Sequence, residues 1–289
     1  MQQIFEGLGL GAIYASLALA LAIIFRSTGV VNFAQGEMAL LGTYVVWQLN
    51  DDGLAIWAAI ALGVALSFFG GALIERAIIR PVEGAKPLTI VIVTFGIFLV
   101  LNGLVVWIWS PIAKQFPAPL PSGGTEIGGV SIRTDSLFLL GILVVEVVAI
   151  WAYFRFTKLG MGMRAAALQP TESRLVGMRV GLMLMAGWGL SAAIGTLAGS
   201  LVANRLFLTP SLMVNLLVYA FAGAALGGFD SPAGAVIGGL AVGVCESLTI
   251  TYVDVVGNQL RLLVPLALIV VVLLVRPQGL FGSTQVSRA

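Results

Sequence analysis

The sequence predicts an all-α polytopic protein that crosses a membrane about eight or nine times. Of its 289 residues, 59% are hydrophobic and only 10% are charged, and the mean hydropathy is +1.05. A chain of this composition cannot cover a soluble globule with polar surface. Its apolar residues also fall into separate runs, and a helix of roughly 20 such residues is long enough to cross the hydrocarbon layer.

About nine apolar runs follow one another along the chain, some of them short. They cover residues 7–25, 31–49, 54–74, 88–109, 137–154, 182–203, 214–228, 233–251 and 262–275. The residues before the first run include no Lys or Arg, so we expect this run to stay in the protein as a span and not to be a cleaved signal peptide. The whole chain, residues 1–289, is then a single transmembrane domain.

The distribution of Lys and Arg predicts the orientation, because connections rich in these residues remain in the cytoplasm. Arg76, Arg80 and Lys86 mark the connection after the third run as cytoplasmic, and Arg276 with Arg288 marks the C-terminus. Counting helices between these points places the N-terminus outside. The Pro- and Gly-rich stretch 110–135 also lies outside. Arg205 and Arg261 then fall near the outer surface, where we expect their side chains to reach the headgroups.

A further basic connection, at about residues 155–181, is expected to form a cytoplasmic coupling loop. It carries five of the 15 basic residues and one acid, Glu172. The composition of residues 160–168 favours a short helix, Pro170 is placed to begin a second one, and Gly177 is placed to end it. An ordered helical loop on the cytoplasmic side is typical of a docking surface for a partner.

Several chemistries are excluded by residues that the sequence lacks. The chain has no His and a single cysteine, Cys245, so neither a cysteine or histidine metal cluster nor an internal disulfide is expected. No phosphate-binding G-x-x-x-x-G-K-[ST] motif occurs, so ATP is not bound by that route. We expect no cofactor, no metal and no nucleic acid. No set of acid, base and nucleophile suggests an enzyme.

Polar residues interrupt the apolar pattern between the first two runs. Asn32, Gln35 and Glu37 stand there together with Gly36, and a break of this kind is costly in a membrane unless it lines a cavity. A helix that begins near Gly36 can direct its N–H groups at an anionic group of a substrate. The alternative is a tight cytoplasmic turn with Asn32 as the N-cap of the next helix.

Two acids lie within apolar runs, where a charged side chain facing lipid costs about 2.5–3.5 kcal/mol. Glu246 follows Gly238, Gly239 and Gly243 at near-helical spacing, so it belongs to a helix that can approach a neighbour closely. It is either a residue of a substrate pathway or a hydrogen-bonded link between helices. Glu146 is expected to make an interhelical contact.

Four strings in this order are similar to a known family. They are Asn32-Phe33-Ala34-Gln35-Gly36-Glu37, then Glu75-Arg76 with Arg80-Pro81-Val82, then Gly162-Met163-Arg164-Ala165 with Gly177, and finally Leu226-Gly227-Gly228 with Ser231, Gly234-Ala235 and Gly238-Gly239. Together they resemble the permease subunits of branched-chain amino-acid ABC importers. The resemblance covers nearly the whole chain.

This resemblance implies a transport subunit, not an enzyme, in the bacterial cytoplasmic membrane. It implies a substrate path for branched-chain or other hydrophobic amino acids. The implied partners are a second permease subunit in a heterodimer, two cytoplasmic ATP-binding subunits, an extracytoplasmic substrate-binding protein and membrane lipid. The residues expected along the path are Asn32, Gln35, Gly36, Glu37, Tyr219 and Glu246. The residues expected to couple the permease to the ATPase are Gly162, Arg164, Ala165, Ala166, Glu172 and Gly177.

Two departures from the family leave other substrates open. The family more usually has His at the position of Gln35 and Lys at that of Tyr219, so an anionic group would lose a partner at each. One alternative is an importer of the same class that carries urea, amides or aromatic acids, because relatives in the family resemble such importers. A proton-coupled secondary transporter with Glu37 or Glu246 as proton carrier is another, and a purely structural membrane subunit is a third.

Overall fold

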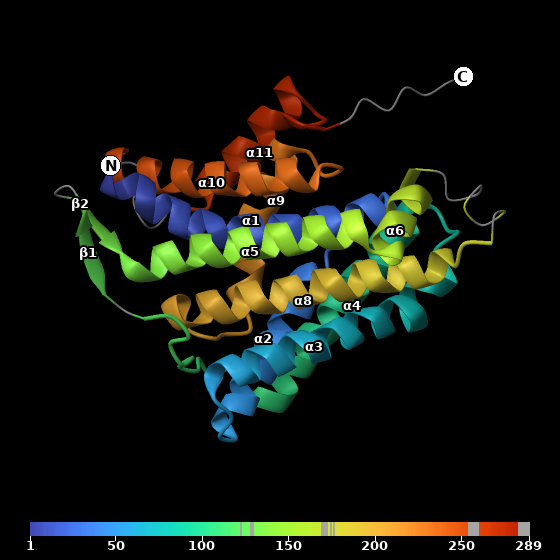
Figure 1. Cartoon of the computed structure of the whole chain (residues 1–289), viewed down its shortest axis with the longest axis horizontal. Helices are drawn as coiled ribbons and strands as arrows, with labels where there is room; N and C mark the ends of the chain where they lie inside the picture. The colour runs from blue at the N-terminus through green and yellow to red at the C-terminus, as the bar shows by residue number, and fades with distance from the viewer. Residues whose placement is uncertain are drawn as a thin grey trace. The chain divides into compact units, whose positions relative to one another are not determined.

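The computed structural model describes residues 1–121, 123–127, 130–168, 173, 175, 177–253 and 260–282. Within these residues, each of the nine predicted runs coincides with a helix (Figure 1). The helices are α1 (Gln2–Thr28), α2 (Gln35–Asp51), α3 (Ile56–Ile74), α4 (Pro87–Trp109), α5 (Thr134–Phe156), α8 (Val180–Leu206), α9 (Leu212–Gly227), α10 (Pro232–Tyr252) and α11 (Leu263–Val275). The helices predicted from the apolar runs are therefore confirmed.

Six helices of the described residues are long and apolar enough to cross a membrane. They are α1, α4, α5, α8, α10 and the continuous stretch Ile56–Val82, which joins α3 to the π-helix η1 (Glu75–Ile79) and the 3-10 helix η2 (Arg80–Val82). Helices α9 and α11 are apolar but shorter, and α2 has 17 residues.

Local sequence signals explain where several helices begin and end. Helix α1 ends at Thr28 because Gly29 adopts a φ of +68°, and its N–H group donates to the carbonyl of Phe25 at 2.7 Å. Helix α10 begins at Pro232, which needs no N–H partner in the first turn. The hydroxyl of Ser231 accepts from the Gly234 N–H group at 3.1 Å and caps this helix.

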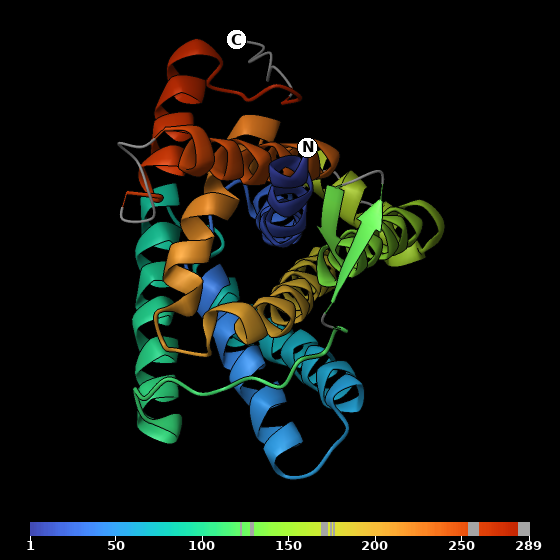
Figure 2. The same ribbon diagram turned by 90° about the vertical axis from the view of Figure 1, so that its left-hand side faces the viewer.

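The stretch 110–135 holds the part of the described chain that departs from an all-helical fold. Strands β1 (Gly124–Ile127) and β2 (Val130–Arg133) pair antiparallel, with Gly124 opposite Arg133 and Ile127 opposite Val130 (Figure 2). Short segments that contain Thr, Ile and Val suit paired strands. Helix α5 begins directly after the hairpin, and Arg133 pairs with Asp135 in its first turn at 2.9 Å.

The chain divides into two compact units. The first unit comprises Met1–Ala22, Leu120–Leu143 and Asn215–Ala289, and the second comprises Ile23–Pro119 and Val144–Val214. Helices α1, α5 and α9 each contribute residues to both units.

Glycine contacts hold the first unit together. A Cβ added to Gly239 of α10 would lie 2.5 Å from the backbone nitrogen of Ala15 in α1, and one added to Gly223 of α9 would lie 2.7 Å from the Cα of Gly239. One added to Gly11 of α1 would lie 2.9 Å from the carbonyl oxygen of Leu240. The close approach of helices that the glycines predicted is thus confirmed for α1, α9 and α10, and α1 and α10 run side by side (Figure 1).

Helices α2, α3 and α8 form the centre of the second unit. Trp188 of α8 is 1% exposed and belongs to an apolar cluster that also contains residues of α2 and α4. Gly71 of α3 lies against the backbone of Trp188, where an added Cβ would be 2.6 Å from the carbonyl oxygen. The Thr196 hydroxyl donates to that of Ser67 at 2.8 Å. Large apolar side chains on α4 remain exposed, such as Trp107 at 82%, and suit contact with lipid.

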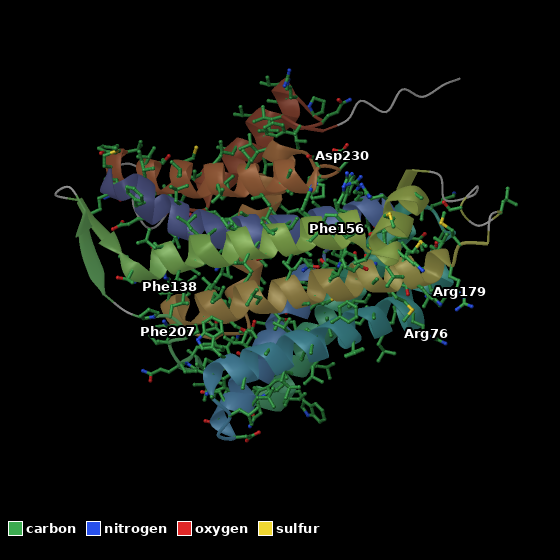
Figure 3. All side chains as sticks on the ribbon, viewed as in Figure 1. Arg76, Phe138, Phe156, Arg179, Phe207 and Asp230 are labelled. Atoms are coloured by element: carbon green, nitrogen blue, oxygen red, sulfur yellow. The ribbon has the colours of Figure 1, made fainter. Side chains whose placement is uncertain are left out.

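Basic residues of two predicted cytoplasmic connections share one end of the second unit. Arg76 and Arg179 lie together at that end and Phe207 lies at the opposite end (Figure 3). An ion pair of 3.0 Å joins Arg80 to Glu75, and Arg80 also donates to the carbonyl of Gly181 at 2.7 Å. The connection after α3 is therefore tied to the start of α8.

The basic loop contains the expected short helix. Helix α6 covers Lys158–Leu168, which includes the predicted 160–168. Gly177 has a φ of +80°, as its predicted role in ending a helix requires. The helix expected to begin at Pro170 lies outside the described residues.

Candidate functional site

The polar segment between α1 and α2 is buried and breaks the helical path. Asn32 is 2% exposed, and its side-chain oxygen accepts from the N–H group of Ala34 at 3.0 Å. Helix α2 starts at Gln35 and its N-cap is Ala34, with no side-chain cap. The alternative prediction of Asn32 as the N-cap is therefore wrong, because the Asn32 side chain closes the preceding turn instead.

Gln35 connects the start of α2 to the middle of α8. Its side-chain nitrogen donates to the carbonyl of Ser191 at 3.0 Å, and the Ser191 hydroxyl donates back to its oxygen at 2.7 Å. Gly195, one turn further along α8, lies against Gln35 and Ala39, where a Cβ would be 2.8 Å from that of Ala39. Gln35 is completely buried, and both ends of its amide have a protein partner.

Glu37 is also completely buried, and only one of its two oxygens is satisfied. Oε2 accepts from the Asn102 side chain of α4 at 3.2 Å, and Asn102 also donates to the carbonyl of Pro210 at 3.1 Å. Oε1 has no hydrogen-bond partner among the described residues. A buried polar atom of this kind calls for an explanation. A donor on a bound molecule or a water is suited to it.

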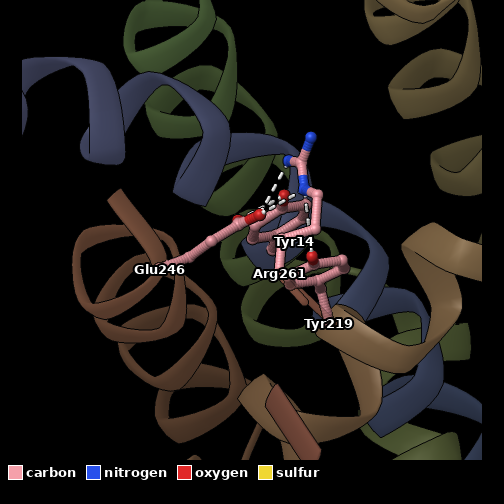
Figure 4. Close-up of polar contacts among 4 residues, drawn as sticks. All are labelled: Tyr14, Tyr219, Glu246 and Arg261. Atoms are coloured by element: carbon pink, nitrogen blue, oxygen red, sulfur yellow. Dashed lines mark hydrogen bonds and ion pairs between the residues drawn. The ribbon is translucent and has the colours of Figure 1, made fainter. Parts of the chain in front are cut away.

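A second polar cluster lies in the first unit and joins three helices to the turn that precedes α11 (Figure 4). The Glu246 carboxylate of α10 accepts from the Tyr14 hydroxyl of α1 at 2.7 Å and forms an ion pair with Arg261 at 2.7 Å. The Nε atom of Arg261 also donates to Glu246 at 3.1 Å and to the Tyr219 hydroxyl of α9 at 3.3 Å. The rings of Tyr14 and Tyr219 stack with centroids 4.6 Å apart. We call these four residues the Glu246 cluster.

The cluster changes two expectations for Arg261 and Tyr219. Headgroup contact was expected for Arg261, but its side chain pairs with Glu246 instead. The absence of a lysine at Tyr219 suggested that a positive charge is missing here. The guanidinium group of Arg261 donates a hydrogen bond to the Tyr219 hydroxyl. Arg261 therefore supplies a positive charge next to Tyr219, although it lies elsewhere in the chain.

The six predicted path residues therefore fall into two groups. Asn32, Gln35, Gly36 and Glu37 belong to the second unit, and Tyr219 and Glu246 belong to the first. All six are buried. Glu146, for which an interhelical contact was expected, is 9% exposed.

Helix α6 places the predicted coupling residues on two faces. Gly162 lies against the end of the Met183 side chain in α8, which would have to move to admit a larger residue. Met163 and Ala166 are buried in an apolar cluster with Met183. Ala165 is exposed, and Arg164 is partly buried, with its Nε atom unpartnered among the described residues. The predicted coupling residue Glu172 lies outside the described residues.

The face of α6 directed away from α8 is largely apolar. Leu159 and Met161 are each 47% exposed, and Lys158 and Ala165 are exposed beside them. Side chains of this kind in a basic loop are suited to contact with another protein.

A family model described as "Branched-chain amino acid transport system / permease component" matches residues 3–273 of the chain. The chain belongs to this family. Its resemblance to the branched-chain amino-acid permeases is confirmed, and the protein is a multi-pass membrane permease, a transport subunit and not an enzyme.

Individual relatives match the permease over its length. It is 27% identical to the high-affinity branched-chain amino acid transport system permease protein BraD of Pseudomonas aeruginosa, over all of this chain and 97% of that protein. It is 29% identical to the high-affinity branched-chain amino acid transport system permease protein LivH of Escherichia coli K12, over all of this chain and 97% of that protein. The probable LivH of Methanocaldococcus jannaschii is 29% identical over 92% of this chain and 87% of that protein.

Sequence reasoning missed several residues of the permease that complete these sites. Asn102 is a lone amide in the apolar α4, and Ser191 is one of several hydroxyls in α8, so the first carried a weak signal and the second none. Tyr14 lies in the apolar first run, and no neighbouring residue in the sequence indicates a functional role for it. Arg261 carried the clearest signal, because a basic residue on the predicted outer side departs from the usual charge pattern.

Proposed function

We propose that this permease forms part of the translocation path of an ABC importer for branched-chain or other hydrophobic amino acids, in the bacterial cytoplasmic membrane. The family match over residues 3–273 carries the proposal, and relatives described as high-affinity permeases for these amino acids support the substrate class. The proposed partners are a second permease subunit, two ATP-binding subunits in the cytoplasm and an extracytoplasmic substrate-binding protein. ATP hydrolysis belongs to those partners.

Uptake of labelled leucine by the assembled complex in proteoliposomes tests this function. We expect uptake to require ATP on the side of the ATP-binding subunits and the substrate-binding protein on the other side, and to persist when an ionophore collapses the proton gradient. Uptake that follows the proton gradient and needs no ATP would instead support a secondary transporter.

The proposed orientation has the N-terminus outside and the C-terminus in the cytoplasm. The shared position of Arg76 and Arg179 at one end of the second unit supports it (Figure 3), because basic connections stay in the cytoplasm. The exposed connection between α2 and α3, at Asp52, then lies outside, and the exposed Lys86 before α4 lies inside.

Cysteine labelling in intact cells checks this orientation. In a Cys245→Ser background, which removes the one native thiol, Asp52→Cys should react with an impermeant maleimide added outside. Lys86→Cys should react only after the membrane is opened. The reverse pattern would contradict the orientation and the proposed position of the basic loop.

The exposed face of α6 is proposed as the surface that docks on an ATP-binding subunit. Its opposite face is fixed to α8 through Gly162, Met163 and Ala166, so a displacement of α6 is passed to α8. A coupling element needs a connection of this kind, because the transmembrane helices must move with the partner.

The segment from Asn32 to Glu37 is proposed to line the path. Glu37→Gln and Asn32→Ala should each slow uptake per assembled complex, because both change buried polar atoms, Glu37 Oε1 and Asn32 Nδ2, that have no hydrogen-bond partner in the part of the chain that the structure describes. Gly36→Leu should slow it more, since it adds bulk at a buried position beside the helix start.

A matched control is Asn50→Ala, which removes an amide from the exposed last turn of α2. It should leave uptake per complex unchanged. If Asn32 only stabilises a turn, the loss of its hydrogen bond with Ala34 costs about 1 kcal/mol of stability and leaves transport intact. Unchanged uptake in both polar variants would contradict the path role.

A further inference from the structure

One edge of the Arg261 guanidinium group takes no part in the Glu246 cluster. Its Nε and Nη2 atoms donate to Glu246 and Tyr219, whereas Nη1 makes no hydrogen bond to any residue that the structure describes. Figure 4 shows this second terminal nitrogen pointing away from Glu246 and Tyr219. The Arg261 side chain as a whole is 36% exposed, whereas that of Glu246 is completely buried, so the accessible part of the pair belongs to the arginine.

The cluster holds the guanidinium group in a single orientation. Glu246 is completely buried, and its Oε1 accepts from Arg261 at 2.7 and 3.1 Å while its Oε2 accepts from Tyr14. The Nε atom of Arg261 also donates a hydrogen bond to the Tyr219 hydroxyl at 3.3 Å. Because a planar guanidinium group is rigid, fixing one edge also fixes the direction of the other. The exposed edge is preorganised for a ligand.

A contribution to stability does not by itself explain the ion pair between Arg261 and Glu246. A buried ion pair often contributes little net stability, because both charges lose their hydration. Ionisable residues within membrane segments commonly belong to substrate pathways. The exposed donor edge therefore points to a ligand that the pair serves.

We propose that Arg261 recognises the carboxylate group of the transported substrate, with Glu246 and Tyr219 as positioning residues. The proposal rests on the proposed function and deepens it. Two N–H groups on one edge of a guanidinium group match a carboxylate. Because Glu246 offsets much of the Arg261 charge, the carboxylate is held weakly, and a transport path needs binding that still permits release.

Saturation-transfer NMR on the assembled transporter in nanodiscs, without the substrate-binding protein, measures such weak binding. Three probes separate the groups of an amino acid: leucine, isocaproate, which lacks the amino group, and isopentylamine, which lacks the carboxylate. We expect leucine and isocaproate to bind the wild type. Arg261→Gln should weaken both at least about tenfold, the usual effect of losing a hydrogen bond to a charged group, and should leave isopentylamine unchanged.

Two further variants separate recognition from folding. Arg133→Gln makes the same change in an ion-paired arginine outside the Glu246 cluster and should leave the binding of all three probes unchanged. Arg261→Lys keeps the charge but loses the planar edge, so it should restore part of the binding of the two acids. Size-exclusion profiles establish assembly, and Arg261→Lys replaces Arg261→Gln if the latter does not assemble.

Equal weakening of the acids and the amine would show a structural role and overturn the proposal, as would unchanged binding of the acids in Arg261→Gln. Restoration of leucine and isocaproate by Arg261→Lys, without a change in isopentylamine, would support it. Wild-type uptake in the same preparation tests the proposed function separately. Acid-selective binding through Arg261 without ATP-driven uptake rejects the transport proposal and leaves only the binding of a carboxylate by Arg261.

Discussion

Replacing Gly239 by alanine is expected to disrupt the packing of the first unit. The added Cβ would lie 2.5 Å from the backbone nitrogen of Ala15, and a backbone atom cannot move aside as a flexible side chain does. Overpacking of this kind typically costs about 1–3 kcal/mol. We expect the upper part of that range, measured as a lower melting temperature of the purified complex and a smaller assembled fraction.

Gly70→Ala is the matched control, because a Cβ at Gly70 of α3 meets no atom within 4 Å. Alanine favours a helix by up to about 1 kcal/mol relative to glycine, so this variant should be neutral or slightly more stable. A melting temperature for Gly239→Ala equal to that of Gly70→Ala would contradict the close packing of α10 on α1.

Reversing the charge of Arg164 is expected to uncouple ATP hydrolysis from transport. Arg164 lies on α6 and its side chain is only partly buried, so the accessible part of its guanidinium group can donate to a carboxylate or carbonyl of an ATP-binding subunit. Loss of a hydrogen bond to a charged group costs about 1.5–3 kcal/mol. Arg164→Glu should therefore lower leucine uptake per complex at least about tenfold, whereas basal ATP hydrolysis continues.

Arg276→Glu provides the comparison, because it makes the same change at an exposed position on the proposed cytoplasmic side, outside the basic loop. It should keep normal uptake. Co-purification of the ATP-binding subunits shows whether Arg164→Glu acts on docking or on a later step. Normal uptake and normal substrate-stimulated ATP hydrolysis in Arg164→Glu would contradict a docking role for Arg164.

The helices were predictable because the membrane imposes a simple rule on the chain. Every backbone N–H and carbonyl group in hydrocarbon must be paired, so an apolar run of sufficient length forms a helix. This rule explains why each of the nine runs coincides with a helix. The hairpin of β1 and β2 lies in the stretch 110–135, where no such rule applies. Its two strands have four residues each, too few for a clear alternating pattern.

The candidate sites were predictable only where a residue is unusual for its surroundings. Glu246 and Glu37 stand out because a carboxylate in an apolar environment is costly. Their partners lie far away in the chain: Tyr14 is 232 residues from Glu246, and Asn102 is 65 residues from Glu37. A tyrosine or an asparagine in an apolar helix gives no sign of which distant residue it contacts.

The sequence by itself determined the class of protein, the helices and the family, because these follow from local composition, from the length of apolar runs and from short strings of residues. Only the tertiary structure decided that Arg261 turns to Glu246 and not to the headgroups, that Gln35 is bonded to Ser191, and that one oxygen of Glu37 has no partner in the described residues. The physical reason is that a hydrogen bond or an ion pair depends on distance and direction in space, and packed helices bring together side chains that are far apart along the chain.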